Sequence, residues 1–261
     1  MTDQFKNVRV MDIDFTSTTM DLFLSNAVYP RLAQSQKCFI VTANPEIVIA
    51  TRHNAHFKET VQSADYVLPD GIGIINAAKM MGTPIDARLC GVDVMHHMLG
   101  HAAEKGYSVY FIGAKEDSNR KAVENALKKY PGLIVAGRQH GYADLYDEAF
   151  IRTVVEAKPD IVLVALGMMK QEGWIRDHID WFDKGVFMGI GGSLDALSGM
   201  SKRAPSIWIR FQLEWLYRLI RQPKRIIRVV KVGQFMLMHV PIIQHLGKII
   251  GYNRSRARKK R

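Results

Sequence analysis

The chain has 261 residues, of which 48% are hydrophobic and 23% charged, and it carries a net charge of +11. This composition is typical of a globular protein and excludes a mostly disordered or fibrous one. Two cysteines, Cys38 and Cys90, are too few for a disulfide scaffold or a cysteine-rich zinc module. The first residues lack the basic start and apolar run of a signal peptide, and no stretch offers ~18 uninterrupted apolar residues. We therefore expect a protein that is made and kept in the cytoplasm.

The positive charge is concentrated in the last quarter of the chain. Residues 201–261 hold 16 Lys and Arg against one acid, Glu214, a balance of +15. The first 200 residues hold 20 bases and 24 acids, a balance of −4. This asymmetry predicts a polyanionic partner for the C-terminal segment: a membrane surface, phosphate or nucleic acid.

The first 200 residues alternate between strand and helix signals. Continuous apolar runs predict strands that are buried on both faces. These runs are Cys38–Thr42, Ser108–Ile112, Leu133–Ala136, Asp160–Leu166 and Val186–Ile190, and shorter candidates are Val8–Phe15 and Asp65–Leu68. Helical patterns lie between them, such as Ser118–Tyr130 and Leu145–Ala157. Repeated βα units predict an α/β fold, a parallel sheet flanked by helices, with ligands at the carboxyl ends of its strands.

The pattern changes after residue 200. We expect a core, residues 1–200, followed by a helical basic appendage, residues 201–261. Pro205 can open a helix, whose apolar face would be formed by Trp208, Phe211, Trp215 and Leu219. One narrow arc of such a helix would hold a row of arginines, namely Arg218, Arg221, Arg225 and Arg228. Four neighbouring guanidinium groups favour contact with phosphate, and the alternative is a solvated basic face.

Two patterns invite a metal interpretation. Asp12-Ile13-Asp14 has the spacing with which many metal-dependent transferases hold a diphosphate, but it lies in the first predicted strand. We favour a strand-end and turn role for it. His97 and His101 are four residues apart on a predicted helix, as zinc-binding histidines are, but no third ligand is evident. A solvated or core helix face is the better interpretation, so we expect no metal site.

Polar residues follow two of the predicted strands. Thr42-Ala43-Asn44-Pro45-Glu46 comes directly after a strand and opens a helix, whose N-terminus offers free N–H groups to an anion. Asp70 ends another strand, and the glycines after it let a ligand approach the backbone. An aspartate there can accept a proton from a sugar hydroxyl. Helix capping is the alternative at both places. Arg88 is a further candidate for holding phosphate or sugar oxygens.

At these residues the chain resembles the WecG/TagA/CpsF family of bacterial glycosyltransferases. The segments that carry the resemblance are Thr42–Glu46, Pro69–Gly73, Arg88 with Gly91-Val92-Asp93, Phe111–Ala114, His140–Tyr142, Leu166-Gly167, Lys170–Glu172, Gly189–Asp195, Lys202–Pro205, Glu214–Leu219, Pro223 and Arg225. One motif would be weak support, whereas this many in the same order are specific.

The resemblance implies a Rossmann-like core that transfers N-acetylmannosamine, or a related sugar, from a UDP-sugar to undecaprenyl-diphosphate-linked N-acetylglucosamine. In the teichoic-acid branch this transfer inverts the anomeric centre and requires no metal, so we expect no cofactor. The C-terminal segment of such enzymes targets the membrane and helps to complete the site. We therefore expect a peripheral protein on the inner face of the cell membrane, with shallow insertion by Phe235–Met238 and Ile242-Ile243.

The resemblance also implies roles for individual residues. Asp70 resembles the family's proposed base, and Thr42 and Asn44 resemble its sugar-site residues. Three positions match residues near the nucleotide, namely Tyr142, Gln171 and Asp195. Three more resemble appendage arginines that reach over the site, namely Arg218, Arg225 and Arg228.

Other interpretations stay open at the level of the sequence. The same family includes enzymes that transfer other UDP-sugars, such as uronic acids, and a transferase of this fold with a soluble acceptor is a further alternative. A nucleic-acid-binding nucleotide sensor would use the basic tail Arg254–Arg261, although no recognised nucleic-acid module is present, so we expect no nucleic-acid partner. The oligomeric state, including a homo-oligomer, is not determined by the sequence.

Overall fold

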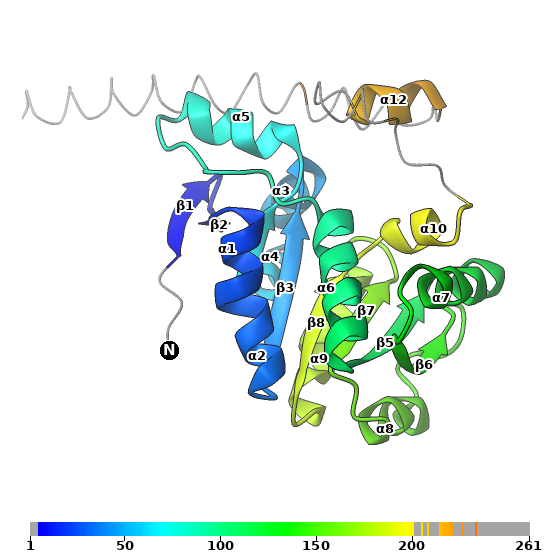
Figure 1. Ribbon diagram of the computed structural model, residues 1–261. Helices are drawn as coiled ribbons and strands as arrows, with labels where there is room; N and C mark the ends of the chain where they lie inside the picture. The colour runs from blue at the N-terminus through cyan, green and yellow to red at the C-terminus, as the bar shows by residue number, and fades with distance from the viewer. Residues whose placement is uncertain are drawn as a thin grey trace, which may run out of the picture.

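The computed structural model describes residues 5–200 together with residues 205, 208, 214–221, 226 and 233. Its centre is a six-stranded sheet with the order β4-β3-β8-β7-β5-β6, in which every pairing is parallel (Figure 1). The strands are β3 (Lys37–Ala43), β4 (Tyr66–Pro69), β5 (Ser108–Gly113), β6 (Ile134–Gln139), β7 (Ile161–Ala165) and β8 (Gly185–Gly189). The predicted α/β fold with a parallel sheet is confirmed.

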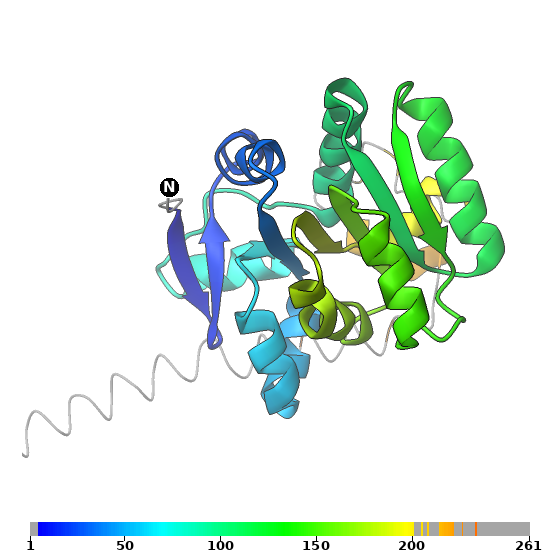
Figure 2. The ribbon, with the colours of Figure 1, turned by 90° about the horizontal axis from the view of Figure 1, so that it is seen from below.

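Helices cover both faces of the sheet, as the view along it shows (Figure 2). One face carries α1 (Met20–Phe23), which continues through a π-helical turn (Leu24–Val28) into α2 (Tyr29–Ala33), and then α6 (Gly91–Lys105), α7 (Glu116–Lys129) and α10 (Ser193–Leu197). The other face carries α3 (Pro45–His53), α4 (Ala55–Gln62), α8 (Glu148–Glu156) and α9 (Lys170–His178), with a 3-10 turn at Ile179–Trp181. The helix α5 (Ile72–Met80) packs against the N-terminal strand β1 (Lys6–Val10).

Each inner strand supplies side chains to two hydrophobic cores. Along β3, Cys38 and Ile40 enter the core under α6, whereas Phe39 and Val41 enter the core under α3 and α9. Side chains alternate in the same way along β5 and β7. Both faces of these strands are dry, which is why they read as continuous apolar runs rather than as an alternating pattern.

The N-terminal segment differs from the prediction. The run Val8–Phe15 is not one strand but the hairpin of β1 with β2 (Ile13–Ser17), which pair antiparallel outside the main sheet. The two residues between the strands, Met11 and Asp12, both have positive φ, as a two-residue hairpin turn of the I′ type requires. Aspartate tolerates this left-handed conformation better than most residues, so the turn role expected for Asp12 is correct.

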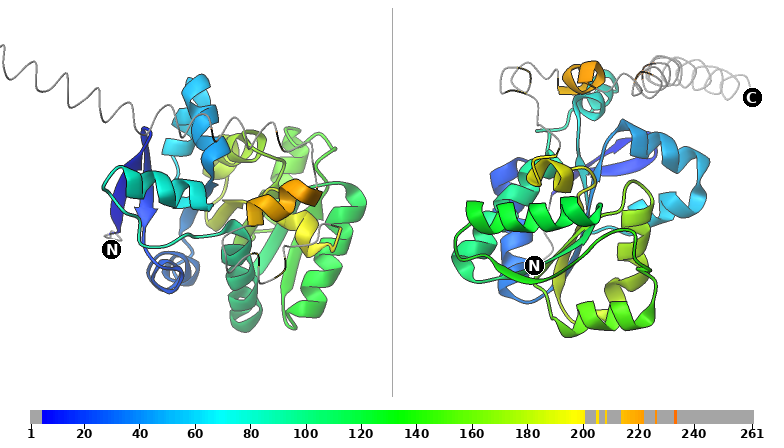
Figure 3. Two further views of the ribbon diagram at one scale, coloured as in Figure 1. Left: turned by 90° about the horizontal axis from the view of Figure 1, so that it is seen from above. Right: turned by 90° about the vertical axis from the view of Figure 1, so that its right-hand side faces the viewer.

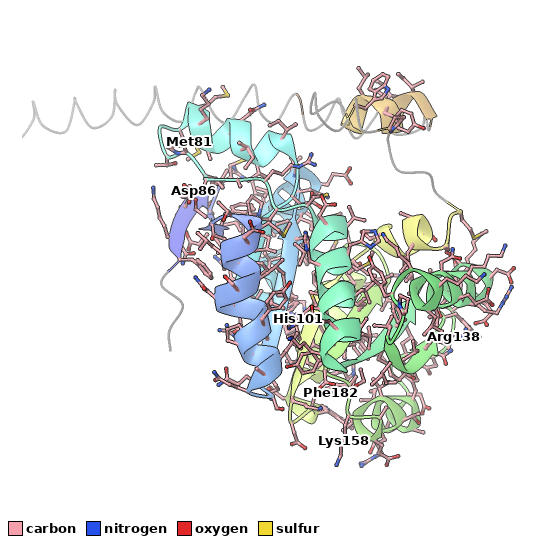
Figure 4. The ribbon with its side chains drawn as sticks, in the orientation of Figure 1. Met81, Asp86, His101, Arg138, Lys158 and Phe182 are labelled. Atoms are coloured by element: carbon pink, nitrogen blue, oxygen red, sulfur yellow. The ribbon has the colours of Figure 1, made fainter. Side chains whose placement is uncertain are left out.

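The two edges of the sheet lie at opposite ends of the molecule. At one end, which we call the amino edge, the parallel strands begin, and at the other, the carboxyl edge, they finish. Lys158 and Phe182 precede β7 and β8 and lie at the amino edge, at the bottom of Figure 4. Met81 and Asp86 lie at the opposite end, in the segment that joins α5 to α6 (Figure 4).

The helix that was expected to start at Leu145 starts at Glu148, where Asp147 caps it, and Leu145 is buried instead. All motifs that carry the family resemblance within the core fall at the carboxyl edge or beside it.

Candidate active site

The six strands end almost level at the carboxyl edge. The register brings together the last or next-to-last residues of neighbouring strands: Ala43 pairs with Pro69, Ile112 with Gln139, Gly113 with Ala165, and Val164 with Gly189. The helices that follow neighbouring strands then lie on opposite faces of the sheet. The chain runs from β3 to α3 on one face and from β8 to α10 on the other, and in the same way from β7 to α9 and from β5 to α7. In open α/β sheets, ligands bind at the carboxyl ends of the strands where neighbouring connections diverge in this way.

Asp70 lies at this edge directly after β4. Its backbone N–H donates to the carbonyl of Ala43 at 3.0 Å, which ties the ends of β4 and β3 together. Its carboxylate oxygen Oδ2 accepts from the backbone N–H of Gly91 at 3.5 Å. Gly91 is the first residue of α6, a helix of 15 residues, so the carboxylate lies at the positive end of that helix. Asp70 is half-buried.

The two glycines after Asp70 allow the two strand-end motifs to touch. Gly71 has φ of +110°, a conformation that glycine adopts without strain. A Cβ on Gly73 would lie 2.6 Å from Cγ of Pro45, so the start of α5 rests directly on the first residue of α3. The motifs around Asn44 and Asp70 therefore form one contiguous unit.

Thr42 completes this unit from β3. Its hydroxyl donates to the carbonyl of Gly189 at 3.4 Å, across the gap between β3 and β8. A Cβ on Gly91 would lie 3.0 Å from the Thr42 hydroxyl oxygen, so the start of α6 packs on Thr42. Thr42, Asp70 and the N-terminus of α6 consequently meet.

Asn44 performs the capping role that was the alternative for it. Its amide oxygen accepts from the backbone N–H groups of Glu46 at 2.9 Å and Ile47 at 3.1 Å, at the N-terminus of α3. A contact between Asn44 and a sugar stays a prediction. Arg88 lies in the segment that leads into α6, and its neighbour Leu89 donates to the carbonyl of Pro69 at 3.0 Å. This bond holds the segment of Arg88 beside the end of β4.

At the other half of the carboxyl edge, around the ends of β5 and β7, backbone groups lie in close contact. The N–H of Ala114 donates to the carbonyl of Ala165 at 2.9 Å, and the N–H of Gly141 donates to the carbonyl of Ala114 at 2.8 Å. Gly113, with φ of +115°, lies so near Ala165 that a Cβ would be 2.2 Å from its carbonyl oxygen. Tyr142 follows these contacts, and 75% of its surface is exposed. A broad aromatic face thus stands free beside the ends of β5 and β7.

Gln171 and its neighbour Glu172 support the loop after β8. The Gln171 amide oxygen accepts from Gly191 N–H at 3.0 Å, and its NH₂ donates to Glu172 at 2.8 Å. Glu172, only 1% exposed, also accepts from Met169 N–H at 2.7 Å, and burial raises the pKa of this carboxyl. The buried Gln171 side chain is therefore engaged with protein, and a nucleotide contact stays a prediction. Sequence reasoning quoted Glu172 in a motif but gave it no role.

Asp195 lies on α10 at the same edge. Its carboxylate accepts a hydrogen bond of 2.6 Å from the hydroxyl of Ser118, in the first turn of α7. Sequence reasoning missed Ser118 and its neighbour Asn119. A usable signal existed, because these two polar residues occupy the buried face of an otherwise amphipathic helix, with Ala122, Val123 and Ala126.

Comparison with known proteins decides the family. The model of the glycosyl transferase WecG/TagA/CpsF family matches residues 8–248. A protein of Bacillus spizizenii, named N-acetylglucosaminyldiphosphoundecaprenol N-acetyl-beta-D-mannosaminyltransferase, is 36% identical over 227 residues, which cover 87% of this chain and 88% of the relative. A Staphylococcus aureus protein of the same name is 37% identical over 231 residues, or 88% and 90% of the two chains. The chain belongs to the WecG/TagA/CpsF family. It is a glycosyltransferase, and the expected resemblance is confirmed.

Part of the candidate site of this glycosyltransferase falls in the C-terminal segment. Arg218 belongs to α12 (Glu214–Arg221), whereas Arg225 and Arg228 lie outside the described residues, as do Phe235–Met238, Ile242-Ile243 and the tail Arg254–Arg261. Figures 1 and 3 both place α12 beyond the carboxyl edge, at the end of the molecule where α5 stands. Over the residues described, none of the helices combines the length and apolar character that crossing a bilayer requires.

The two patterns that suggested a metal lie elsewhere. Asp12 is in the hairpin turn and Asp14 is in β2, and both carboxylates face the exposed guanidinium of Arg9, at 4.0 and 3.9 Å. His101 stacks on the ring of Tyr29 with centroids 3.7 Å apart, and burial lowers its pKa. These contacts support the turn and helix-packing interpretations. Within the described part of the chain, no three His, Cys, Asp or Glu residues gather as metal ligands would.

Proposed function

We propose that this glycosyltransferase moves N-acetylmannosamine from UDP-N-acetylmannosamine to undecaprenyl-diphosphate-linked N-acetylglucosamine, in the synthesis of teichoic acid or a related cell-surface polysaccharide. The observation that supports the reaction class is the meeting of Thr42, Asp70 and the N-terminus of α6 at the carboxyl edge. The names of the Bacillus and Staphylococcus relatives support the donor sugar and the lipid acceptor.

Asp70 acts as the general base in this proposal. The acceptor 4-hydroxyl attacks the anomeric carbon of the donor, its proton passes to the Asp70 carboxylate, and UDP leaves from the opposite side with inversion. General-base catalysis of this kind contributes about 10²–10⁴-fold to the rate. The Gly91 N–H at 3.5 Å orients the carboxylate, and Thr42, which packs on Gly91, limits where the sugar can lie. Arg88, in the segment beside β4, would bind sugar or phosphate oxygens.

UDP binds along the other half of the edge. The exposed ring of Tyr142 stacks on the uracil of UDP, and a carboxylate oxygen of Asp195 accepts hydrogen bonds from the ribose hydroxyls. Gln171 shapes the loop at Gly191 beside the diphosphate. The negative charge that develops on UDP needs cationic partners, and Arg218, Arg225 and Arg228 of the appendage supply them, so that no metal or other cofactor is required.

The lipid acceptor requires the enzyme to reach a membrane. The segment 201–261 carries +15, and each of its basic residues near an anionic surface contributes about 1 kcal/mol of attraction. We infer a peripheral association with the inner face of the cell membrane. Sedimentation with anionic vesicles should recover the full chain, whereas Phe235→Ser with Leu237→Ser should weaken recovery and spare activity on a soluble acceptor.

A donor panel tests the proposal directly. The full chain is incubated with a short-chain lipid-diphosphate N-acetylglucosamine and, separately, with UDP-N-acetylmannosamine, UDP-glucose and a UDP-uronic acid, and products are identified by mass. We expect a product heavier by one N-acetylhexosamine in the first reaction alone. Transfer from another donor would reassign the sugar within the family. Absence of transfer from all donors, together with tight RNA retention on filters, would favour the nucleic-acid-binding alternative.

Alanine substitution tests the arginines separately from the membrane. Arg225→Ala with Arg228→Ala should lower turnover on the short-chain acceptor, because stabilisation of the leaving group does not depend on a bilayer. The matched control is Arg256→Ala with Arg258→Ala in the basic tail, which changes net charge equally. Equal turnover of both double variants would show that Arg225 and Arg228 only anchor the protein.

A further inference from the structure

Two consecutive polar side chains are buried in the first turn of α7, beneath the candidate nucleotide site. Ser118 is 1% exposed and Asn119 is 0% exposed. Burial of polar groups costs stability unless hydrogen bonds replace the lost water, so each such group is expected to have partners. The proposed mechanism uses neither residue. Asn119 bonds to the ends of β5 and β6, which form one wall of the candidate nucleotide site, and Ser118 bonds to Asp195 on α10, which forms the opposite wall.

Asn119 joins the ends of two strands. Its NH₂ group donates to the carbonyl of Gly113 at 2.9 Å and to the carbonyl of Gln139 at 3.1 Å. These carbonyls belong to the last residues of β5 and β6, so one side chain fixes how far apart the two strands end. The loops that start there carry Ala114 and, after His140, the exposed Tyr142.

The amide oxygen of Asn119 is buried without a hydrogen-bond partner among the described residues. An unsatisfied buried acceptor is a destabilising feature in a folded protein. A smaller apolar residue would avoid that cost, and the amide oxygen contributes nothing to the joint between the strands. The feature that fits the place is the NH₂ group, which reaches both carbonyls at once.

Ser118 fixes the opposite wall. Its hydroxyl donates to Oδ1 of Asp195 at 2.6 Å, and Ser198 closes the arrangement by donating to the Asp195 carbonyl at 2.8 Å. Hydrogen bonds to a carboxylate are among the stronger ones in proteins, so this one holds the Asp195 side chain in one orientation. The helices α7 and α10 lie side by side, as Figure 3 also shows.

We propose that Ser118 and Asn119 are positioning residues for the uridine part of the donor, Asn119 by setting the β5–β6 wall that presents Tyr142 and Ser118 by orienting Asp195. The inference rests on the proposed function, because it takes a UDP-sugar as the donor. Uridine is remote from the reacting atoms, so the support it receives is the same in the ground state and in the transition state. Loss of such uniform binding raises KM and leaves kcat unchanged.

The test compares steady-state kinetics of Ser118→Ala and Asn119→Ala with those of the wild type, using the full chain and the short-chain acceptor. For each variant we expect KM for UDP-N-acetylmannosamine to rise by about tenfold, with kcat within about twofold and KM for the acceptor unchanged. Ser118→Thr keeps the hydroxyl and should restore most of the donor affinity. Arg120→Ala is the matched control, because Arg120 lies on the same helix but pairs only with exposed acids, and it should change nothing.

Calorimetric titration with UDP alone separates the possible failures. We expect Kd for UDP to rise by the same factor as KM, at a temperature where circular dichroism shows each variant folded. A fall in kcat at unchanged donor KM, or wild-type values for Ser118→Ala, would overturn the inference, and Ser118→Ala decides it should Asn119→Ala unfold. If the wild type binds UDP but transfers no N-acetylmannosamine, the proposed function fails, and weaker UDP binding by Ser118→Ala still supports the inference.

Discussion

The two halves of the carboxyl edge are built in different ways. At the β3–β4 half, two polar side chains, those of Thr42 and Asp70, lie at the N-terminus of α6. At the β5–β7 half, backbone groups lie in close contact around Gly113, and a buried amide, Asn119, holds them. In the proposed function, the first half supplies the general base and the second shapes the surface that binds UDP. Substitutions in the first half should therefore change turnover, and those in the second should change binding or stability.

Asp70→Asn should give the largest effect and tests the first half of this comparison. The amide keeps the size of the side chain and can still accept from Gly91 N–H, but it cannot take the acceptor proton. We expect kcat to fall by about 10²–10⁴-fold, with thermal stability and UDP affinity unchanged. Turnover is measured at saturating donor and short-chain acceptor. Near wild-type turnover would remove Asp70 from the role of base.

Gly113→Ala tests the second half through stability. The new Cβ would lie 2.2 Å from the Ala165 carbonyl oxygen, and the residue has φ of +115°. We expect the free energy of unfolding in denaturant to fall by about 3 kcal/mol or more, because backbone must shift to admit the methyl group. Gly106→Ala is the matched control. Gly106 also has positive φ but faces open space, and its cost should be about 1 kcal/mol. Equal costs would show that β5 and β7 can separate without penalty.

Glu172→Gln sharpens the comparison at the loop where the two halves meet. Burial raises the pKa of Glu172 in the folded chain, so protonation favours folding. The contribution of Glu172 to stability is complete below its unfolded pKa of about 4.3 and is lost as pH rises through the folded pKa. The stability of the wild type relative to Glu172→Gln should therefore decrease with rising pH above that value, by at most about 1.4 kcal/mol per pH unit. Denaturant unfolding at several pH values measures this difference, and a difference independent of pH would contradict it.

The smallest effect is expected away from both halves. Asp12→Ala with Asp14→Ala should leave turnover within about twofold, in the presence or absence of EDTA, because the two carboxylates belong to an exposed hairpin and face Arg9. Transfer assays with and without chelator check this. A loss with EDTA that manganese or magnesium restores would make the aspartates candidate metal ligands.

The sequence predicted the parallel sheet, and it predicted that Asp70 and Thr42 lie at the carboxyl ends of strands, whereas their roles in the reaction stay predictions. Buried parallel strands such as β7 leave a continuous apolar signal, and Asp70 and Thr42 stand directly after or within such signals. The hairpin was missed because the mixed apolar and charged residues of Val8–Phe15 also suit a single strand, which the positive φ of Met11 and Asp12 divides.

The supporting half was less accessible to prediction. Asn119 bonds to carbonyls of Gly113 and Gln139, and backbone carbonyls have no sequence signature. Gln171 stood in a recognisable motif, but its bond to Gly191 N–H depends on tertiary packing across α9 and the β8 loop. Local sequence patterns identify candidate ligand-contacting residues more readily than they identify the residues that hold these candidates in place.

The position of β8 has a consequence for how the protein is made. This last strand of the sheet inserts between β3 and β7, and the bond from Thr42 to Gly189 spans 147 residues of chain. Until β8 leaves the ribosome, β3 and β7 each have an unpaired apolar edge, and such edges promote aggregation. Long-range parallel pairing is also slow to form. Synthesis of the core is therefore nearly complete before the candidate site can form, and chains that stop short of β8 would expose both strand edges.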